Sequence, residues 1–170
     1  MKTLVVFHSK SGTTRKVGED IAKALGADVD EITPVNAKPL YRPDGKMDGL
    51  EMMTLVFQVM IKWKTALVPA IKDPADYDLV VVGTPTWGGN LSAPVRSYLS
   101  AHASKFKKVA FFCTMGTSEK YKVASQVMKV FGQMEQLSAS PILTLAVSQE
   151  EADSERAQKA IKEFAAKIKK

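Results

Sequence analysis

The sequence predicts a doubly wound α/β fold, in which helices cover both faces of a five-stranded parallel sheet. Apolar runs of strand length alternate along the chain with segments of helical periodicity, and this alternation is typical of parallel sheets. The runs lack polar alternation, which indicates strands that are covered on both faces. Because the crossovers of such a fold are right-handed, a ligand crevice is expected at the carboxyl ends of the strands.

Five apolar runs are expected to form the strands. They lie at residues 3–7, 28–32, 78–82, 108–113 and 142–147, and the run at 28–32 is the weakest. The loops that follow Phe7, Val82 and Cys113 would therefore face the crevice.

Four stripes of apolar side chains at helical spacing predict the helices. The stripes consist of Val17, Ile21, Ala24 and Leu25; of Val95, Tyr98 and Leu99; of Tyr121, Ala124, Met128 and Phe131; and of Ala157, Ala160, Ile161, Phe164, Ala165 and Ile168. Gly26 is expected to end the first helix, and Pro94 lies in the first turn of the second. Residues 148–151, Ser-Gln-Glu-Glu, match a capping box ahead of the last helix.

Residues 36–73 are long for a single connection between a strand and the next. Pro39, Pro43, Gly45 and Gly49 give the first part a loop composition. The second part is a helix candidate that is apolar nearly all round, so it must be buried. We interpret this segment as an extended loop followed by a core helix. The alternative is that part of it covers the ligand or forms a dimer face.

Composition indicates one soluble domain. A chain of 170 residues with 45% hydrophobic content suffices for one sizeable core and is short for two, so residues 1–170 are expected to form a single domain. The N-terminal apolar run is too short for an export signal, and no stretch reaches the ~20 residues of a membrane span. Cys113 is the single cysteine, which fits a reducing compartment. We expect a cytoplasmic protein.

The basic balance of the chain does not by itself indicate nucleic-acid binding. The formal net charge is +6, but the lysines are spread over amphipathic helices and no aromatic-rich basic motif accompanies them. Solvated helix faces are therefore the preferred interpretation, and an acidic partner is the alternative. No nucleic-acid partner is expected.

The first candidate site is a hydroxyl-rich loop between the first strand and the first helix. It reads Ser9, Lys10, Ser11, Gly12, Thr13 and Thr14. Helix N-termini present free N–H groups to phosphate, and Gly12 lets the backbone approach a ligand closely. A simple Ser/Thr helix cap is the alternative.

This loop resembles the phosphate loop of the flavodoxin family, which has a hydroxyl residue, any residue, a hydroxyl residue, Gly, any residue and Thr. The resemblance extends from Lys2 to about Lys169 and is weakest over residues 36–73. It implies that the loop wraps the 5′-phosphate of FMN and that the strands have the order 2-1-3-4-5. The last strand has no insertion, as in the short-chain class of the family.

The second candidate loop, residues 83–92, is similar to the family's loop after the third strand, where an aromatic residue precedes glycine. By that resemblance Trp87 would flank the isoalloxazine ring, and an aromatic face is a suitable stacking surface. The backbone around it would meet the polar edge of the ring, with contributions from Thr84, Pro85, Thr86, Gly88, Gly89 and Asn90. The alternative is a core tryptophan that caps a turn.

The third candidate loop contains Thr114, Met115, Gly116 and Thr117. Many flavodoxins carry a second aromatic residue here, which stacks on the outer face of the ring, and this loop has none. Met115 or Tyr121 is a candidate substitute. The departure bears on redox tuning and not on binding.

Other phosphate sites fit the sequence less well. A Gly-x-Gly-x-x-Gly motif, a Walker loop and an acidic metal-binding cluster are all missing after the first strand. A low-molecular-weight phosphatase would need Arg six residues after Cys113, where Glu119 stands. Cys113 is therefore expected to be a buried strand residue, and no metal site is predicted.

The resemblance implies FMN as cofactor and leaves its use open. An electron carrier that serves redox partner proteins or small electron acceptors is preferred, because no residue stands out as an acid–base catalyst. His8 is expected to be structural and His102 to lie at the surface. An FMN-dependent NAD(P)H:quinone-type oxidoreductase and a non-catalytic FMN-binding module are the alternatives. The basic residues Lys10, Arg15 and Lys16 would suit acidic partners or an anionic nicotinamide. Both a monomer and a homodimer are compatible with the sequence.

Overall fold

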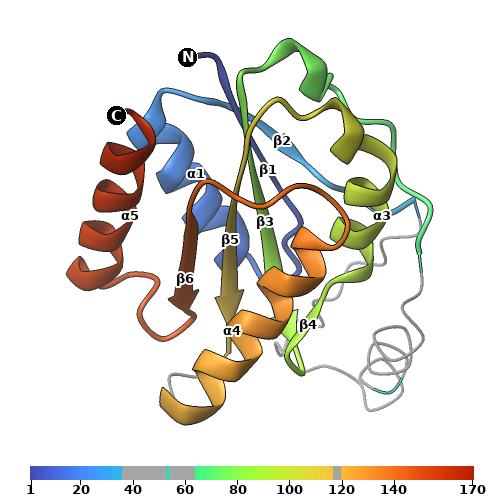
Figure 1. The fold of residues 1–170 in the computed structure, drawn as a ribbon. Helices are drawn as coiled ribbons and strands as arrows, with labels where there is room; N and C mark the ends of the chain where they lie inside the picture. The colour runs from blue at the N-terminus through green and yellow to red at the C-terminus, as the bar shows by residue number, and fades with distance from the viewer. Residues whose placement is uncertain (36–52, 54–63, 117–119) are drawn as a thin grey trace.

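A computed structural model describes residues 1–35, 53, 64–116 and 120–170 of the chain, with the backbone alone for 120–123 (Figure 1). Within these residues, parallel strands β1 (Thr3–Phe7), β2 (Asp28–Glu31), β3 (Leu79–Trp87), β5 (Val109–Met115) and β6 (Thr144–Ser148) form one sheet. Their order is β2-β1-β3-β5-β6. This confirms the predicted doubly wound sheet, because the five parallel strands follow the order 2-1-3-4-5.

Helices cover both faces of the sheet, as predicted. Helices α1 (Thr13–Leu25) and α5 (Glu155–Ile168) lie side by side on one face, whereas α3 (Ala93–His102) and α4 (Lys120–Glu135) lie on the other (Figure 1). Short 3₁₀ turns at Pro74–Asp76 and Ala103–Lys105 precede β3 and follow α3. Gly26 ends α1 in a left-handed conformation with φ 67°, as expected of a C-terminal glycine.

Alternate residues of the three central strands, β1, β3 and β5, belong to two separate cores. Val5 and Phe7 pack with α1 and α5, whereas Leu4 and Val6 pack with α3 and α4. All four side chains are at most 1% exposed. Full burial of such a side chain stabilises the fold by about 1.5–3 kcal/mol. The continuous apolar runs of the central strands are thus the consequence of a sheet that is covered on both faces at its centre.

Two strands extend further than the sequence pattern predicted. β3 continues from Val82 to Trp87, and β5 continues to Met115. The predicted second loop began at Gly83, but this residue lies inside β3 beside the ring of Phe112. A Cβ atom there would overlap the ring. Glycine in this strand therefore makes room for an aromatic ring rather than for a turn.

The predicted apolar stripe of α4 is confirmed at Phe131, which packs against the core, and is wrong at Ala124 and Met128, which are exposed. Met128 is 76% exposed, whereas Val130 and Met134 are fully enclosed. The helix instead meets the sheet through Val130 and Met134, with Val127 and Leu137 partly buried beside them. Two overlapping stripes were available in this sequence, and only packing against the sheet selects one.

The capping box at residues 148–151 does not begin α5. Ser148 and Glu151 do bond, with the Glu151 N–H 3.3 Å from Ser148 Oγ, but they close a separate turn. The helix begins at Glu155, and its cap is Ser154, whose Oγ accepts from the Ala157 N–H at 3.2 Å. The last strand also begins later than predicted, at Thr144.

Of the segment 36–73, the structure describes only residue 53 and the last part, residues 64–73. Residues 36–52 and 54–63, which include the proposed core helix, lie outside the described residues. Residues 65–68 run antiparallel to 33–35, with Val35 N donating to Ala66 O at 2.9 Å and Val68 N to Thr33 O at 2.8 Å.

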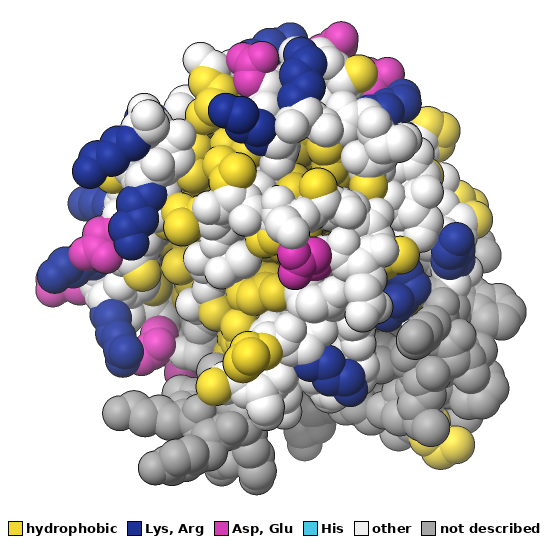
Figure 2. All heavy atoms as spheres, in the orientation of Figure 1, with side chains coloured by type: hydrophobic (Ala, Val, Ile, Leu, Met, Phe, Trp, Pro, Cys, Tyr) yellow, Lys and Arg dark blue, Asp and Glu magenta, His cyan; other side chains and the backbone are white. Residues whose placement is uncertain are grey.

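In the part of the chain that the structure describes, no helix is both long and apolar enough to cross a membrane. Figure 2 shows one face of the molecule, where Lys and Arg alternate with Asp and Glu along α5, and apolar side chains are visible between α5 and α4.

Candidate functional site

The three predicted loops meet at the carboxyl ends of β1, β3 and β5. Two contacts join them. The hydroxyl groups of Thr14 and Thr114 lie 2.8 Å apart and link the first loop to the third. The ammonium group of Lys10 lies 5.5 Å from the centre of the Trp87 ring and links the first loop to the second. Residues from three distant parts of the sequence therefore form one cluster.

The first loop ends at a helix start that is suited to an anion. Gly12 is the N-cap of α1 with φ 94°, a conformation that favours glycine. The first intrahelical bond runs from Lys16 N to Gly12 O at 2.9 Å. The N–H groups of residues 13–15 thus have no partner within the helix. The first turn contains no acidic residue, so the positive end of the helix dipole is not neutralised there.

The four hydroxyl residues of the first loop divide into two pairs. Ser9 Oγ accepts from the Gly12 N–H at 3.2 Å, and Thr14 is 2% exposed and bonded to Thr114. These two hydroxyls shape the loop and attach it to β5. Ser11 is exposed and Thr13 half-buried. The sequence pattern did not distinguish these two roles.

The cations around the first loop are paired with carboxylates. Arg15 forms a two-pronged contact with Glu31, with N–O distances of 3.1 and 2.9 Å. Lys16 contacts Asp20 at 3.1 Å and Asp153 at 3.3 Å. The charge that the sequence places near this loop is therefore partly neutralised at its surface.

The second predicted loop is a β-hairpin. Strand β3 runs to Trp87, and β4 (Asn90–Leu91) returns antiparallel to it. Gly88 and Gly89 have φ values of 56° and 70°, as a two-residue type I′ turn requires. Trp87 is half-buried, and the ring of His8 meets it edge-on at 6.1 Å. The tryptophan thus contacts His8 and Lys10 of the first loop and is not part of either core.

Two side chains of α4, Gln133 and Gln126, contact this hairpin. Gln133 Oε1 accepts from the Leu91 N–H at 2.8 Å, and Gln133 Nε2 donates to Asn90 Oδ1 at 3.1 Å. A Cβ atom on Gly89 would lie 2.9 Å from Cγ of Gln126. Ahead of the turn, Thr84 Oγ1 bonds to Ser92 Oγ at 3.1 Å and is fully buried. Pro85 and Thr86 are also buried.

His8 is buried behind the first loop. Its Nδ1 lies 2.9 Å from the carbonyl oxygen of Ile32, and because a carbonyl only accepts, Nδ1 carries the proton. Burial lowers the pKa of His8 below its ordinary value, against the opposite influence of the Ile32 carbonyl and Glu31.

The third loop is only partly described. Thr114 and Met115 are buried, and Gly116 is exposed. The side chain of Met115 belongs to the core beneath α4, which removes it as a substitute for the second aromatic residue. Thr117 and the side chain of Tyr121 lie outside the described residues. Cys113 is buried in β5, and burial raises the pKa of its thiol to about 12.

Two residues near the hairpin were missed by the sequence analysis. The sequence indicated no role for Gln133 of α4 or for Arg96 in the first turn of α3. The signal was present for Arg96, since it is the one charged residue in the otherwise uncharged stretch 91–99. A cavity of about 540 Å³ between residues 65–74 and α3 is lined by none of the predicted site residues. The loop cluster is the better candidate, because polar groups converge there.

Comparison with known proteins agrees with this arrangement. The family model described as Flavodoxin matches residues 2–155, and none of the curated proteins matches the sequence. Among solved structures, a candidate flavoprotein from Bacteroides eggerthii has a TM-score of 0.73 at 20% identity, with 99% of this chain and 98% of that chain covered.

Two further solved structures show the same fold. A flavoprotein from Lactobacillus acidophilus in complex with FMN has a TM-score of 0.62 at 21% identity, with coverage of 89% and 96% of the two chains. Oxidised flavodoxin 1 from Bacillus cereus has a TM-score of 0.56 at 17% identity, with coverage of 99% and 97%. The family match spans all three loops and most of the chain. This chain therefore belongs to the flavodoxin family.

Proposed function

We propose that the protein binds FMN at the carboxyl ends of β1, β3 and β5 and transfers electrons to redox partner proteins or small electron acceptors. FMN would supply the electron-transfer chemistry, while the protein supplies binding, orientation and electrostatics. The single cysteine supports a reducing, cytoplasmic setting. The observation that carries the proposal is the convergence of the three loops through the Thr14–Thr114 and Lys10–Trp87 contacts.

The start of α1 fits a phosphate group. The N–H groups of residues 13–15 are free of intrahelical bonds, and no atom lies within 4 Å of the place where a Cβ on Gly12 would stand. Ser11 and Thr13 carry the hydroxyls that are not enclosed. These groups would donate to the phosphate oxygens, and hydrogen bonds to a charged group contribute about 1.5–3 kcal/mol each.

The hairpin fits a planar ring system. Trp87 offers a half-buried aromatic face, and its indole would stack on the isoalloxazine ring. Lys10 stands over the Trp87 ring, so the ring system and the ammonium group would lie on different faces or Lys10 would move toward the phosphate. Backbone groups of the Gly88–Gly89 turn would meet the polar edge of the ring.

Binding selectivity tests the proposal. FMN and riboflavin are titrated into the protein freed of any flavin, and quenching of flavin fluorescence gives both dissociation constants. FMN is expected to bind at least tenfold more tightly, because riboflavin lacks the phosphate. Ser11→Ala should weaken FMN binding and leave riboflavin binding unchanged. Ser100→Ala, at an exposed position of α3, is the matched control. Equal affinity for the two flavins would overturn the phosphate assignment.

A steady-state assay separates the carrier from the reductase. The FMN-loaded protein is mixed with NADH or NADPH and a quinone, and nicotinamide oxidation is followed by absorbance. A carrier is expected to show no turnover above that of free FMN. Saturable turnover above that level would replace the carrier with the NAD(P)H:quinone-type oxidoreductase.

A further inference from the structure

The described arginines differ in how their charge is balanced. Arg15 and Arg156 are exposed, and each contacts a carboxylate at 2.9 Å. Arg96 is only 7% exposed. Its Nη2 donates to Gln133 Oε1 at 3.4 Å, and among the described residues no carboxylate forms an ion pair with it. Within the described part of the chain, the most buried arginine is thus the one without a carboxylate partner, although buried charges are normally paired.

The guanidinium of Arg96 is nevertheless not sealed inside the protein. Within the described residues, the fully enclosed side-chain nitrogens and oxygens that lack a partner are Thr86 Oγ1, Tyr98 Oη and His102 Nδ1. The unbonded N–H groups of Arg96 are not among them, so they reach the surface while the rest of the side chain is packed. Burial lowers the pKa of Arg96, and no carboxylate of the described residues acts in the opposite direction.

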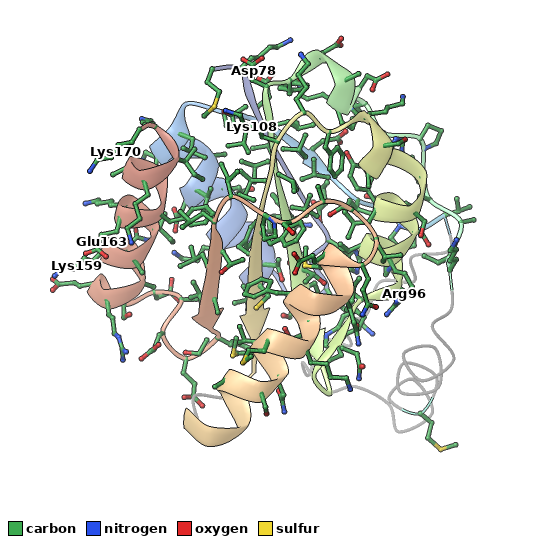
Figure 3. The ribbon with its side chains drawn as sticks, viewed as in Figure 1. Asp78, Arg96, Lys108, Lys159, Glu163 and Lys170 are labelled. Atoms are coloured by element: carbon green, nitrogen blue, oxygen red, sulfur yellow. The ribbon has the colours of Figure 1, made fainter. Side chains whose placement is uncertain are left out.

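The surroundings of Arg96 add further attraction for an anion. The residue lies in the first turn of α3, a ten-residue helix whose first turn contains no acidic residue. The positive end of that helix dipole is therefore not neutralised. Figure 3 shows Arg96 of α3 on the opposite side of the molecule from Lys159 and Glu163 of α5 and from Lys170 at the end of the chain.

Gln133 connects Arg96 to the Trp87 hairpin. Gln133 accepts from Arg96 and from the Leu91 N–H through the same Oε1, and it donates to Asn90. Arg96 is thus two hydrogen bonds from the hairpin proposed to contact the flavin. An anion bound at Arg96 would lie outside the phosphate loop at the start of α1.

We propose that Arg96 is the oxyanion-binding residue of a second ligand site beside the Trp87 hairpin, which takes the carboxylate or phosphate group of a small molecule. The planar guanidinium has five N–H donors and suits two-pronged contact with either group. The site does not depend on FMN, although its position would suit a small electron donor or acceptor that carries such a group.

The test uses the full chain saturated with FMN, so that a phosphate site at the start of α1 is already filled. Inorganic phosphate and acetate are titrated separately at constant ionic strength. The Nε–H resonances of the arginines are followed by ¹⁵N NMR, and the signal of Arg96 is assigned by its loss in Arg96→Gln. Arg156→Gln is the matched control at an exposed, paired arginine. The two anions distinguish a phosphate ligand from a carboxylate ligand.

A saturable shift of the Arg96 signal with one of the two anions is expected, with the Arg156 signal unchanged. Arg96→Lys keeps the charge but loses the two-pronged contact of the guanidinium. Anion binding should therefore weaken roughly tenfold, the equivalent of one lost hydrogen bond to a charged group. No shift at Arg96, or equal shifts at all arginines, would overturn the proposal. The same samples report FMN binding by flavin fluorescence, so failure of the flavin assignment would be seen separately.

Thermal unfolding gives a second, independent readout. If Arg96 serves to bind a ligand and not to stabilise the fold, Arg96→Met should unfold at the same or a higher temperature in anion-poor buffer. The substitution removes a largely buried side chain whose charge no described carboxylate balances. Phosphate or acetate should then raise the midpoint of the wild type and of Arg156→Gln more than that of Arg96→Met. If Arg96→Met instead lowers the midpoint and the anions raise all three alike, Arg96 has only a structural role.

Discussion

Thr14 contributes to the loop cluster through its side chain rather than through its position in a motif. It is 2% exposed, and its hydroxyl bonds to Thr114 across two strand ends. Burial of both hydroxyls makes this bond costly to break, because the remaining partner would be left without one. The last threonine of the family's phosphate loop thus has a structural task in this chain.

Thr14→Val is expected to lower the free energy of unfolding by about 1–3 kcal/mol, because the similar shape is kept while the Thr114 hydroxyl is left unsatisfied. Urea unfolding followed by circular dichroism measures the change. Thr14→Ser, which keeps the hydroxyl, should lose less. A valine variant as stable as the wild type would mean that water replaces the bond.

Trp87 is half-buried and belongs to neither core, so its removal should affect the ligand more than the fold. Trp87→Ala is expected to weaken FMN binding at least tenfold, since stacking and burial of an aromatic pair are lost. Flavin fluorescence quenching measures the affinity, and the visible spectrum of the bound flavin should shift. Trp87→Phe should retain most of the affinity. Unchanged affinity and spectrum in Trp87→Ala would exclude stacking at this residue.

The β3–β4 hairpin is the element on which the second loop depends. Gly88 and Gly89 both have positive φ, and left-handed backbone costs other residues about 1–2 kcal/mol. The two glycines differ in their surroundings. A Cβ on Gly88 would meet open space, whereas one on Gly89 would stand 2.9 Å from Gln126 Cγ.

Gly89→Ala should therefore destabilise the protein more than Gly88→Ala. The backbone cost of about 1–2 kcal/mol is common to both, and the excess at residue 89 arises from the contact with Gln126. Adding Gln126→Ala should remove the excess in a double-mutant cycle. Chemical denaturation of the four variants gives the values. Equal losses of unfolding free energy at the two glycines would show that the Gln126 side chain moves away from the new Cβ atom at no cost.

The hairpin also shows where prediction from the sequence ended. The order of the sheet, the four helices and the meeting of the three loops followed from apolar runs, helical stripes and the family's motifs. Gly83 was read as the end of a strand, because a glycine that admits the Phe112 ring cannot be told from a turn glycine without the fold. Met128 was placed on the buried face for a similar reason, since α4 carries two stripes and its contact with the sheet selects the other. No sequence pattern predicts the hydrogen bonds between Gln133 and β4.

At the scale of the whole molecule, the two cores enclose the sheet and leave the chemistry to its carboxyl edge. The central strands are buried on both faces, so the polar groups of the loop cluster are concentrated where β1, β3 and β5 end. Exposed ion pairs such as Lys105–Asp73 at 2.9 Å contribute little to stability, because each is screened by water. The titration of the buried groups should therefore dominate the pH dependence of stability near neutrality.

His8 and His102 are both partly enclosed, and burial is the main cause that lowers the pKa of each. For His8, Lys10 acts in the same direction, and the Ile32 carbonyl and Glu31 oppose it. A histidine with a folded pKa below its unfolded value of about 6.5 is protonated more readily in the unfolded chain. Its contribution to stability is complete above that value and is lost as the pH falls toward the folded pKa.

The free energy of unfolding is therefore expected to fall between about pH 7 and pH 5, by at most about 1.4 kcal/mol per pH unit for each proton taken up. Urea unfolding at a series of pH values measures the slope. His8→Asn keeps a donor near the Nδ1 position for the Ile32 carbonyl and does not titrate, so its slope should be shallower than that of the wild type. His102→Asn gives the share of the second histidine, and the acid-induced repulsion of this basic chain is common to all variants. If His8→Asn has the same slope as the wild type, folding does not lower the pKa of His8, and the Ile32 carbonyl and Glu31 would then fully offset the effect of burial.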